Sequence, residues 1–404
     1  MSIVIVGSSV TGIRTAQALR RHGVETAITV LDEDPFPPYD KPPLSKGVLA
    51  AAGDGEPVPL LTPGELAALD LDLRLGVRVI GLDPVRQTLR CDDGGETAYT
   101  RLVIATGVTP RTLPGADSLI GVHTLRRFTD ASALRAQLPA AERIVVVGAG
   151  FIGSEFASAA LEYGAQVAIV EAQETPMAHL LGAEVGAELA RLHRINGVEL
   201  HAGVRFAGFE GSGRVSGVAL ADGRVLPADL VVVGIGARPA TDWLAGSGLP
   251  IDDGIACDEN LRVTGFPGIY AAGDVASRQH PIYRTALRIE HWTNAGEHAE
   301  AVAADIAAVP APPAQLPYVW SDQYGKRIQI IGRPALGHPS AVHGTVDTHR
   351  FVAVYADDSG VAVGALAVDD PRALMKCRKA ITNGHLVDDL GLDDIGSLPA
   401  SRSR

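Results

Sequence analysis

The feature that most constrains the fold of this chain is a glycine turn that occurs twice, each time after a run of β-branched residues. Residues 3–12 read IVIVGSSVTG, and residues 144–153 read IVVVGAGFIG. In each case the apolar run is typical of a buried strand, and a helical pattern follows the glycines. A strand, a tight glycine turn and a helix N-terminus together direct backbone N–H groups at a pyrophosphate. The sequence therefore predicts two dinucleotide-binding folds, an arrangement suited to passing electrons between two dinucleotides.

The second motif has all three glycines of the dinucleotide fingerprint. Gly148 permits the tight turn, Gly150 lets the backbone approach phosphate, and Gly153 allows close packing of helix on strand. Glu171 ends the next expected strand, where a carboxylate can accept from the adenosine ribose hydroxyls; the alternative is a solvated strand end. No arginine or lysine occurs between Glu171 and Arg191, so a 2′-phosphate would meet a carboxylate without a counter-charge. We therefore expect NADH rather than NADPH in this fold.

The first motif departs from the fingerprint because its middle glycine is replaced by Ser9. Gly7 and Gly12 keep the other two glycine positions, and a small hydroxyl side chain can hydrogen-bond phosphate. The acidic pair Asp32 and Glu33 ends the following strand. One of the two carboxylates is expected on the adenosine ribose, and spacing alone does not choose between them.

The chain is long enough, at 404 residues, for two or three domains of α/β type. The first fold predicts a strand at 2–6, a helix at 12–22 and a strand at 26–31; the second repeats this plan at 143–147, 153–163 and 166–170. Further helices are expected at 183–195, at 292–308 and near 371–382, with strands over 318–368. A proline-rich linker at 309–314 is the clearest boundary. The predicted domains are a discontinuous first nucleotide domain (1–107 and 229–309), a second nucleotide domain (108–228) and a C-terminal α+β domain (310–404).

Composition and charge exclude several classes of protein. A net charge of −12 argues against nonspecific nucleic-acid binding, and no apolar run is long enough to span a bilayer. Because a strand is expected from Ser2 onward, we expect no secretory or transit peptide. The three cysteines are isolated, and the histidines lack the spacing of a metal site, so we expect no metal and a reducing cytoplasmic location. With no coiled-coil pattern, we expect a monomer or a weak dimer.

Several longer motifs accompany the glycine turns. They are Pro-Pro-Leu-Ser-Lys at 42–46, Ala-Thr-Gly at 105–107, Gly-Ser-Glu at 153–155, Ala-Gly-Asp at 272–274, Arg-Ile-Glu-His-Trp-Thr-Asn-Ala at 288–295 and Trp-Ser-Asp-Gln-Tyr at 320–324. With these motifs the sequence resembles the FAD-dependent NADH:ferredoxin reductases that serve cytochrome P450s and Rieske oxygenases. The resemblance covers essentially the whole chain.

The resemblance implies a glutathione-reductase-like pair of Rossmann-like domains, with FAD in the first, NAD(H) in the second and a [2Fe-2S] ferredoxin as electron acceptor. It places Glu33 rather than Asp32 on the FAD ribose, and Lys46 near the flavin ring. Glu155 would face the nicotinamide carboxamide and pair with Lys46; these two are the candidate catalytic residues. The implied FAD site comprises Gly7, Ser9, Thr11, Gly12, Asp32, Glu33, Lys41, Lys46, Val79, Ala105, Thr106, Gly107, Arg126 (phosphate or adenine end), Gly273, Asp274 (ribityl chain) and Trp292 (beside the isoalloxazine). The implied NAD site comprises Gly148, Gly150, Phe151, Ile152, Gly153, Glu155, Glu171 and Gly236.

Plainer interpretations stand beside some of these roles. Lys46 could be a surface lysine after a loop, and Trp292 and Trp320 could be core residues. Where the family usually has arginine, this chain has Lys41, which keeps the charge but loses the bidentate fork for phosphate.

Related flavoproteins that reduce disulfides or peroxides carry a redox cysteine shortly after the first fold, but residues 34–60 of this chain contain none. Electrons would then leave the flavin directly for an outer-sphere acceptor. The alternatives are an NADH oxidase or peroxidase, and a flavoprotein whose NADH-bound form acts in binding or signalling. A basic patch on the C-terminal domain is expected to receive an acidic ferredoxin, although each cation could equally belong to a solvated face. Its residues are Lys326, Arg327, Lys376, Arg378 and Lys379.

Overall fold

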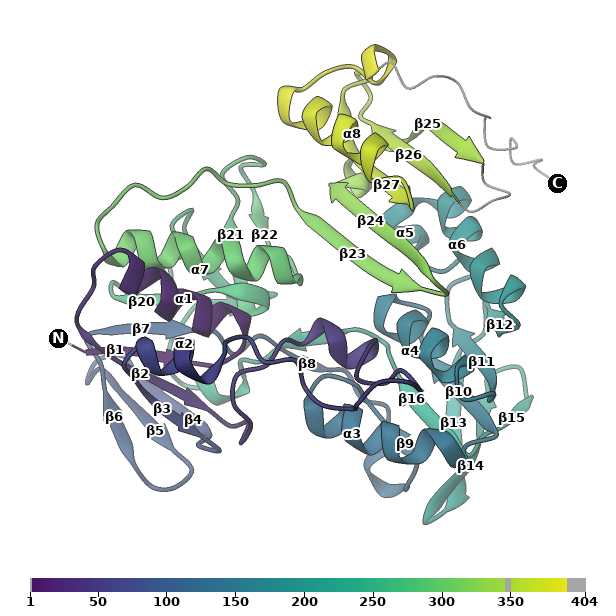
Figure 1. The fold of residues 1–404 in the computed structure, drawn as a ribbon, viewed down its shortest axis with the longest axis horizontal. Helices are drawn as coiled ribbons and strands as arrows, with labels where there is room; N and C mark the ends of the chain where they lie inside the picture. Colours follow the sequence, from purple (N-terminus) through teal and green to yellow (C-terminus); the bar gives the residue numbers. More distant parts are fainter. Residues whose placement is uncertain (1, 346–349, 391–404) are drawn as a thin grey trace. The chain divides into compact units, whose positions relative to one another are not determined.

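The computed structural model describes residues 2–345 and 350–390, which fall into two compact units (Figure 1). Unit 1 comprises Met1–Pro42, Pro57–Thr109 and Ala237–Gln315. Unit 2 comprises Pro43–Glu56, Pro110–Gly236 and Leu316–Arg404. Each unit contains one of the two predicted glycine turns, so the internal repeat in the sequence corresponds to two separate folds.

Unit 1 is built on a five-stranded parallel sheet of order β20-β7-β1-β2-β3. The central strand β1 is apolar from Ile3 to Val6, as expected for a strand covered on both faces, and Val4 and Ile5 are 0% exposed. Helices α1 and α7 lie side by side (Figure 1). The main elements are β1 Ser2–Val6, α1 Val10–Arg21, β2 Ala27–Asp32, α2 Pro63–Ala68, β3 Leu71–Leu75, β7 Arg101–Ile104, β20 Ile269–Ala271 and α7 Trp292–Ile306.

Smaller sheets complete this unit: one is an antiparallel meander, and another is mixed. They are the meander β4 Val79–Asp83, β5 Thr88–Cys91 and β6 Glu96–Ala98, and the four-stranded sheet of β18 Ile251–Asp252, β19 Gly254–Cys257, β21 Ala276–Gln279 and β22 Ala286–Leu287. In the mixed sheet, β19 is parallel to β21. A short ladder pairs β8 Val108–Pro110 with β17 Ala237–Pro239.

Unit 2 repeats the parallel arrangement with a sheet of order β12-β11-β10-β16-β9. Its elements are β9 Val122–His123, α3 Phe128–Gln137, β10 Arg143–Val147, α4 Phe151–Leu161, β11 Gln166–Glu171, α5 Ala178–Leu181, α6 Ala183–Ile195, β12 Glu199–Ala202 and β16 Leu230–Val233, with a meander of β13 Phe206–Ser212, β14 Arg214–Leu220 and β15 Val225–Pro227. The predicted domain boundary at 229 assigned β16 to the first domain, whereas this strand pairs with β10. Its buried Leu-Val-Val-Val run fits either parallel sheet, so the sequence pattern does not choose between them.

The C-terminal part of unit 2 is a five-stranded antiparallel sheet with helix α8 packed on it (Figure 1). Its elements are β23 Tyr318–Gln323, β24 Lys326–Gly332, β25 His338–Thr345, β26 Arg350–Ala356, β27 Ala362–Val368 and α8 Pro371–Asn383. This sheet shares one hydrophobic core with α5 and α6, in which Leu181, Val185 and Leu189 meet Phe351 and Tyr355. The predicted C-terminal domain is therefore continuous with the second nucleotide fold.

Most predicted elements are confirmed within one or two residues. Helix α6 has the predicted bounds, and the predicted helices at 12–22 and 153–163 begin two residues earlier, at Val10 and Phe151. Each begins directly after the position of the middle fingerprint glycine, so the turn is shorter than the sequence pattern suggested. The loop Pro43–Glu56 belongs to unit 2, where Arg135 binds it. The Arg135 guanidinium donates to the carbonyl oxygens of Val48 (3.0 Å), Ala50 (2.7 Å) and Gly53.

Candidate functional site

The glycine turn of unit 1 is tight because backbone atoms occupy the space of the missing side chains. A Cβ on Gly7, which has a φ of +110°, would lie 2.4 Å from the carbonyl oxygen of Ala105, and a Cβ on Gly12 would lie 1.9 Å from the carbonyl oxygen of Gly7. The Ala-Thr-Gly segment therefore lies directly against the turn. Ser9 is the N-cap of α1, but its side chain accepts no hydrogen bond from the first turn of the helix. The first N–H groups of α1 thus remain available to an anion.

A carboxylate is fixed beside this turn, and it belongs to Asp32. One of its oxygens accepts from the backbone N–H (2.5 Å) and the hydroxyl (2.8 Å) of Ser8, and the other accepts from the backbone N–H of Asp34 (2.8 Å). Glu33 is exposed and pairs with Arg78 at 3.7 Å. The geometry thus favours Asp32 over Glu33 as the carboxylate that accompanies a dinucleotide. Asp32 directly follows Leu31, which pairs with Val6 at the start of the turn, and this register decides the choice.

Two further segments with predicted site residues, 272–274 and 105–107, are held by contacts within unit 1. A Cβ on Gly273 would lie 2.4 Å from the Thr11 hydroxyl, so the Gly-Asp segment containing Asp274 lies against the start of α1. The N–H of Gly273 donates to Nδ1 of His298 at 3.1 Å. The sequence did not identify His298 as a site residue; complete burial holds its pKa well below the usual value, so it is a neutral acceptor. The Thr106 hydroxyl donates to the carbonyl of Ala240 (3.0 Å).

The remaining predicted FAD residues are spread over both units. Lys41 lies over the Tyr39 ring, with Nζ 4.7 Å from its centroid, and the Trp292 indole N–H donates to Asp40 at 2.7 Å. Val79 is a core residue, 6% exposed. Arg126 belongs to unit 2, as does Lys46. Their roles toward FAD stay predictions.

The turn of unit 2 reproduces that of unit 1 in detail. A Cβ on Gly148 (φ +105°) would lie 2.4 Å from the carbonyl of Gly234, and a Cβ on Gly153 would lie 2.1 Å from that of Gly148. Gly234 and Gly236 thus occupy the places that Ala105 and Gly107 have in unit 1, with φ +88° at Gly236 and +68° at Gly107. Phe151, Ile152 and Gly153 form the first turn of α4. Such a cradle fits a pyrophosphate in each unit.

Glu171 is the counterpart of Asp32. Its carboxylate accepts from the backbone N–H of Ala149 (2.9 Å) and from that of Gln173 (2.8 Å), the same two backbone positions as in unit 1. Both folds therefore present a carboxylate at the end of the second strand, as a ribose-binding dinucleotide fold requires.

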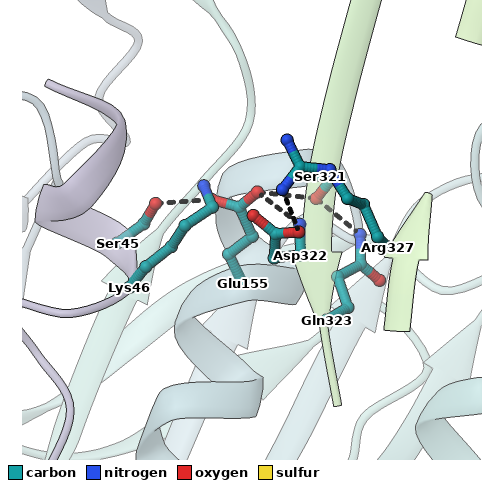
Figure 2. Close-up of polar contacts among 7 residues, drawn as sticks. All are labelled: Ser45, Lys46, Glu155, Ser321, Asp322, Gln323 and Arg327. Atoms are coloured by element: carbon teal, nitrogen blue, oxygen red, sulfur yellow. Dashed lines mark hydrogen bonds and ion pairs between the residues drawn. The ribbon is translucent and has the colours of Figure 1, made fainter. Parts of the chain in front are cut away.

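The predicted pair of Lys46 and Glu155 is present within unit 2 (Figure 2). Glu155 is 4% exposed, and one of its carboxylate oxygens accepts from Lys46 Nζ at 2.7 Å and from the Ser45 hydroxyl at 2.5 Å. The other oxygen accepts from the Ser321 hydroxyl at 2.7 Å and from the backbone N–H of Asp322 at 3.3 Å. A buried carboxylate satisfied by one cation and three further donors can hold a lysine in a fixed position. The sequence predicted the pair but not the two donors from β23.

The family follows from two matches along the chain. Residues 1–299 match the family described as pyridine nucleotide-disulphide oxidoreductase, and residues 318–397 match the family described as Reductase C-terminal. The chain belongs to the pyridine nucleotide-disulphide oxidoreductase family.

Similar members of the family include reductases of known systems. Rhodocoxin reductase of Rhodococcus erythropolis is 36% identical over 385 residues, which are 94% of this chain and 89% of that protein. The ferredoxin--NAD(+) reductase component of the biphenyl dioxygenase system of Paraburkholderia xenovorans (strain LB400) is 34% identical and covers 98% of this chain and 97% of its own length. The structure of the covalent putidaredoxin reductase–putidaredoxin complex matches with a TM-score of 0.91 and 32% identity, over 95% of this chain and 93% of that one. The α/β fold class is thereby confirmed.

Unlike disulfide-reducing flavoproteins, this chain has no cysteine between residues 34 and 60, and its thiols are unsuited to exchange. Cys91, Cys257 and Cys377 are free and buried. Burial raises the pKa of Cys257 and of Cys377 to about 12, so both are protonated thiols at neutral pH. Among the described residues, no helix is long and apolar enough to cross a membrane, and no three histidine, cysteine or acidic side chains are placed to share a metal ion.

Proposed function

We propose that the chain is a flavoprotein reductase that takes electrons from NADH through FAD to a [2Fe-2S] ferredoxin, which in turn supplies a cytochrome P450 or a Rieske-type oxygenase. FAD, when bound, would supply the redox chemistry, namely acceptance of a hydride from NADH and release of the two electrons one at a time. The observation that carries the proposal is the repeated cradle, in which Asp32 and Glu171 flank two equivalent glycine turns. The ferredoxin as acceptor is supported by the names of the relatives. We further propose a cytoplasmic location.

Each unit contributes its own residues to this function. We propose that unit 1 holds FAD through the turn at Gly7 and Gly12, with Asp32 on the ribose. In unit 2, the turn at Gly148 would hold the NADH pyrophosphate, and Glu171 would hold the ribose. Glu155 would orient the nicotinamide carboxamide, and Lys46 would provide a fixed positive charge for the flavin.

Anaerobic stopped-flow spectroscopy tests the proposed function. We expect the purified protein to be yellow, NADH to bleach the flavin rapidly, and cytochrome c to be reduced rapidly only after a ferredoxin is added. Direct turnover of peroxide would instead indicate a peroxidase. Slow bleaching with a long-lived charge-transfer complex would indicate a binding or signalling flavoprotein. A colourless protein that refuses flavin on reconstitution would refute all three functions.

The Glu171 carboxylate should determine the choice between NADH and NADPH. Glu171→Arg removes the acceptor for the ribose hydroxyls and supplies a cation for a 2′-phosphate, so we expect the KM for NADH to rise about tenfold and NADPH use to improve. Steady-state kinetics with both nucleotides measure this. Glu210→Arg, the same charge change at an exposed residue of β13, is the control and should leave both KM values unchanged. If the parent protein already uses NADPH as well as NADH, the ribose role of Glu171 is wrong.

Helix α8 offers the surface for an acidic ferredoxin. Lys376, Arg378 and Lys379 are exposed around Met375, which is 58% exposed, and none of these three cations forms an ion pair with another described residue. The two other cations of the predicted patch are engaged locally: Lys326 pairs with Asp369 at 3.0 Å, and Arg327 lies over the Trp320 ring. We propose that the three cations of α8, rather than these two residues, attract the acidic ferredoxin electrostatically.

Charge reversal on α8 tests this surface. For Lys376→Glu/Lys379→Glu we expect the association rate with ferredoxin to fall about tenfold at low ionic strength and the difference to shrink as salt is added. Reduction of ferricyanide, a small acceptor, should be unchanged. Arg90→Glu/Arg205→Glu gives the same net charge as a control, since Arg90 is exposed on β5 and Arg205 is exposed in the loop between β12 and β13. An equal loss of rate in both double variants would show that only net charge matters and would refute the docking surface.

A further inference from the structure

The hydrogen bonds around Glu155 run in one direction, starting on β23. Gln323 Nε2 donates to the Ser321 hydroxyl oxygen at 3.0 Å, and the Ser321 hydroxyl donates to Glu155 at 2.7 Å (Figure 2). A serine hydroxyl has a single hydrogen. Because its oxygen accepts from the Gln323 amide, that hydrogen is directed at the carboxylate. Gln323 therefore fixes the direction in which Ser321 donates.

This chain of donors is dry and continuous. Ser321 is 0% exposed and Gln323 is 3% exposed, so water does not compete for either side chain. The two residues are two positions apart on β23 and lie on the same face of the strand. At the far side of the carboxylate, Lys46 Nζ binds the other oxygen. A change at Ser321 is thus transmitted through one rigid group to Lys46.

A second contact attaches the same hairpin to the same helix without touching the carboxylate. The backbone N–H of Tyr324, in the turn between β23 and β24, donates to the Ser158 hydroxyl on α4 at 2.8 Å. Ser158 lies about one helical turn beyond Glu155. Ser158 therefore helps to hold the hairpin on α4, whereas Ser321 orients the Glu155 carboxylate, and the two roles can be tested by separate substitutions.

We propose that Ser321, oriented by Gln323, is a positioning residue that sets the Glu155–Lys46 pair for hydride transfer, so that the C-terminal domain forms part of the NADH site. The proposal rests on the proposed function. When the Ser321 hydroxyl is removed, the Glu155 oxygen on that side keeps only the longer bond from the N–H of Asp322. The carboxylate is then free to rotate, and the lysine that it holds moves with it.

The test uses the flavin-loaded protein with Ser321→Ala, Ser321→Thr and Gln323→Leu. For Ser321→Ala we expect the limiting rate of flavin reduction by NADH to fall about tenfold, as for loss of a hydrogen bond to a charged group, while the Kd for NADH changes less than about twofold. Labelling of the Lys46 amine, followed by mass spectrometry, should become faster. Ser321→Thr keeps the hydroxyl and should restore the rate. Gln323→Leu should have a smaller effect and add nothing to Ser321→Ala, because both act through one hydroxyl.

Ser158→Ala is the matched control, since it loosens the hairpin but spares the carboxylate. It should lower the thermal midpoint while leaving the hydride-transfer rate and Lys46 labelling unchanged. The proposal is overturned if Ser321→Ala leaves both readouts unchanged, or if Ser158→Ala slows reduction equally. Should Ser321→Ala fail to fold, an unchanged rate in Gln323→Leu would refute the proposal in its place. Lys46 labelling does not require NADH, so it still reports on the Ser321 arrangement if the reductase function itself fails.

Discussion

Replacing Lys46 by alanine should slow flavin reduction by NADH by about a hundredfold, the size of effect found when one preorganised charged or hydrogen-bonding group is lost. The same change should lower the free energy of unfolding by about 2 kcal/mol, because Glu155 would remain buried without its cation. The full cost of breaking a buried pair is about 3–5 kcal/mol, but Lys46 is 22% exposed, and the Ser45 and Ser321 hydroxyls remain as donors. Urea unfolding and anaerobic stopped-flow measure the two effects separately.

A second substitution separates stability from catalysis at this pair. In Lys46→Ala/Glu155→Gln the buried charge is gone, so most of the lost unfolding free energy should return while the hydride-transfer rate stays low. Unchanged flavin binding together with an unchanged reduction rate in Lys46→Ala would remove this lysine from the site. Recovery of the rate in the double variant would mean that Lys46 acts only by neutralising Glu155.

The sequence predicts the parts of the fold that depend on local patterns of residues. Helix α6 has the predicted bounds because its apolar side chains repeat with a helical period and cover the C-terminal sheet. The two parallel sheets follow from β-branched runs that end in glycine turns. No local pattern predicts that the loop containing Lys46 belongs to unit 2. Its position depends on two distant side chains, the Arg135 guanidinium and the Tyr163 hydroxyl, which donates to the Leu49 carbonyl at 2.9 Å.

In the site, too, some residues were predicted from their motifs, whereas hydrogen bonds between distant segments were not. The pairing of Lys46 with Glu155 was predicted through the family resemblance, whereas the donors Ser321 and Asp322 come from a strand more than 160 residues later. Asp32 and Glu33 are adjacent acids at the end of a strand, and only the register of β1 with β2 shows which one accepts from the turn. Hydrogen bonds between distant segments carry no periodicity, so a single sequence does not reveal them.

Two glycines of the second turn should lose different amounts of stability when each is replaced by alanine. Gly148→Ala forces a side chain onto a residue with φ +105°, and its Cβ would lie 2.4 Å from the Gly234 carbonyl oxygen. Backbone strain of about 1–3 kcal/mol adds to this clash, so we expect a large loss of stability and loss of NADH binding. Gly150 has an ordinary φ of −77°, and the nearest atom to a Cβ there is 3.9 Å away. We expect Gly150→Ala to change the free energy of unfolding by no more than about 0.5–1 kcal/mol.

Gly150→Ala should still weaken NADH binding, by about tenfold, because the added methyl group faces the approach of the pyrophosphate. Thermal unfolding and NADH titration distinguish the two variants, and both should retain FAD, whose proposed turn lies in unit 1. The first turn supports this separation, since Ser9 adopts nearly the same backbone conformation (φ −79°, ψ −166°) as Gly150 (φ −77°, ψ −176°). Normal NADH affinity in Gly150→Ala would show that the pyrophosphate does not approach this residue. A stable, NADH-binding Gly148→Ala would show that the turn tolerates a side chain, and would refute the requirement for glycine there.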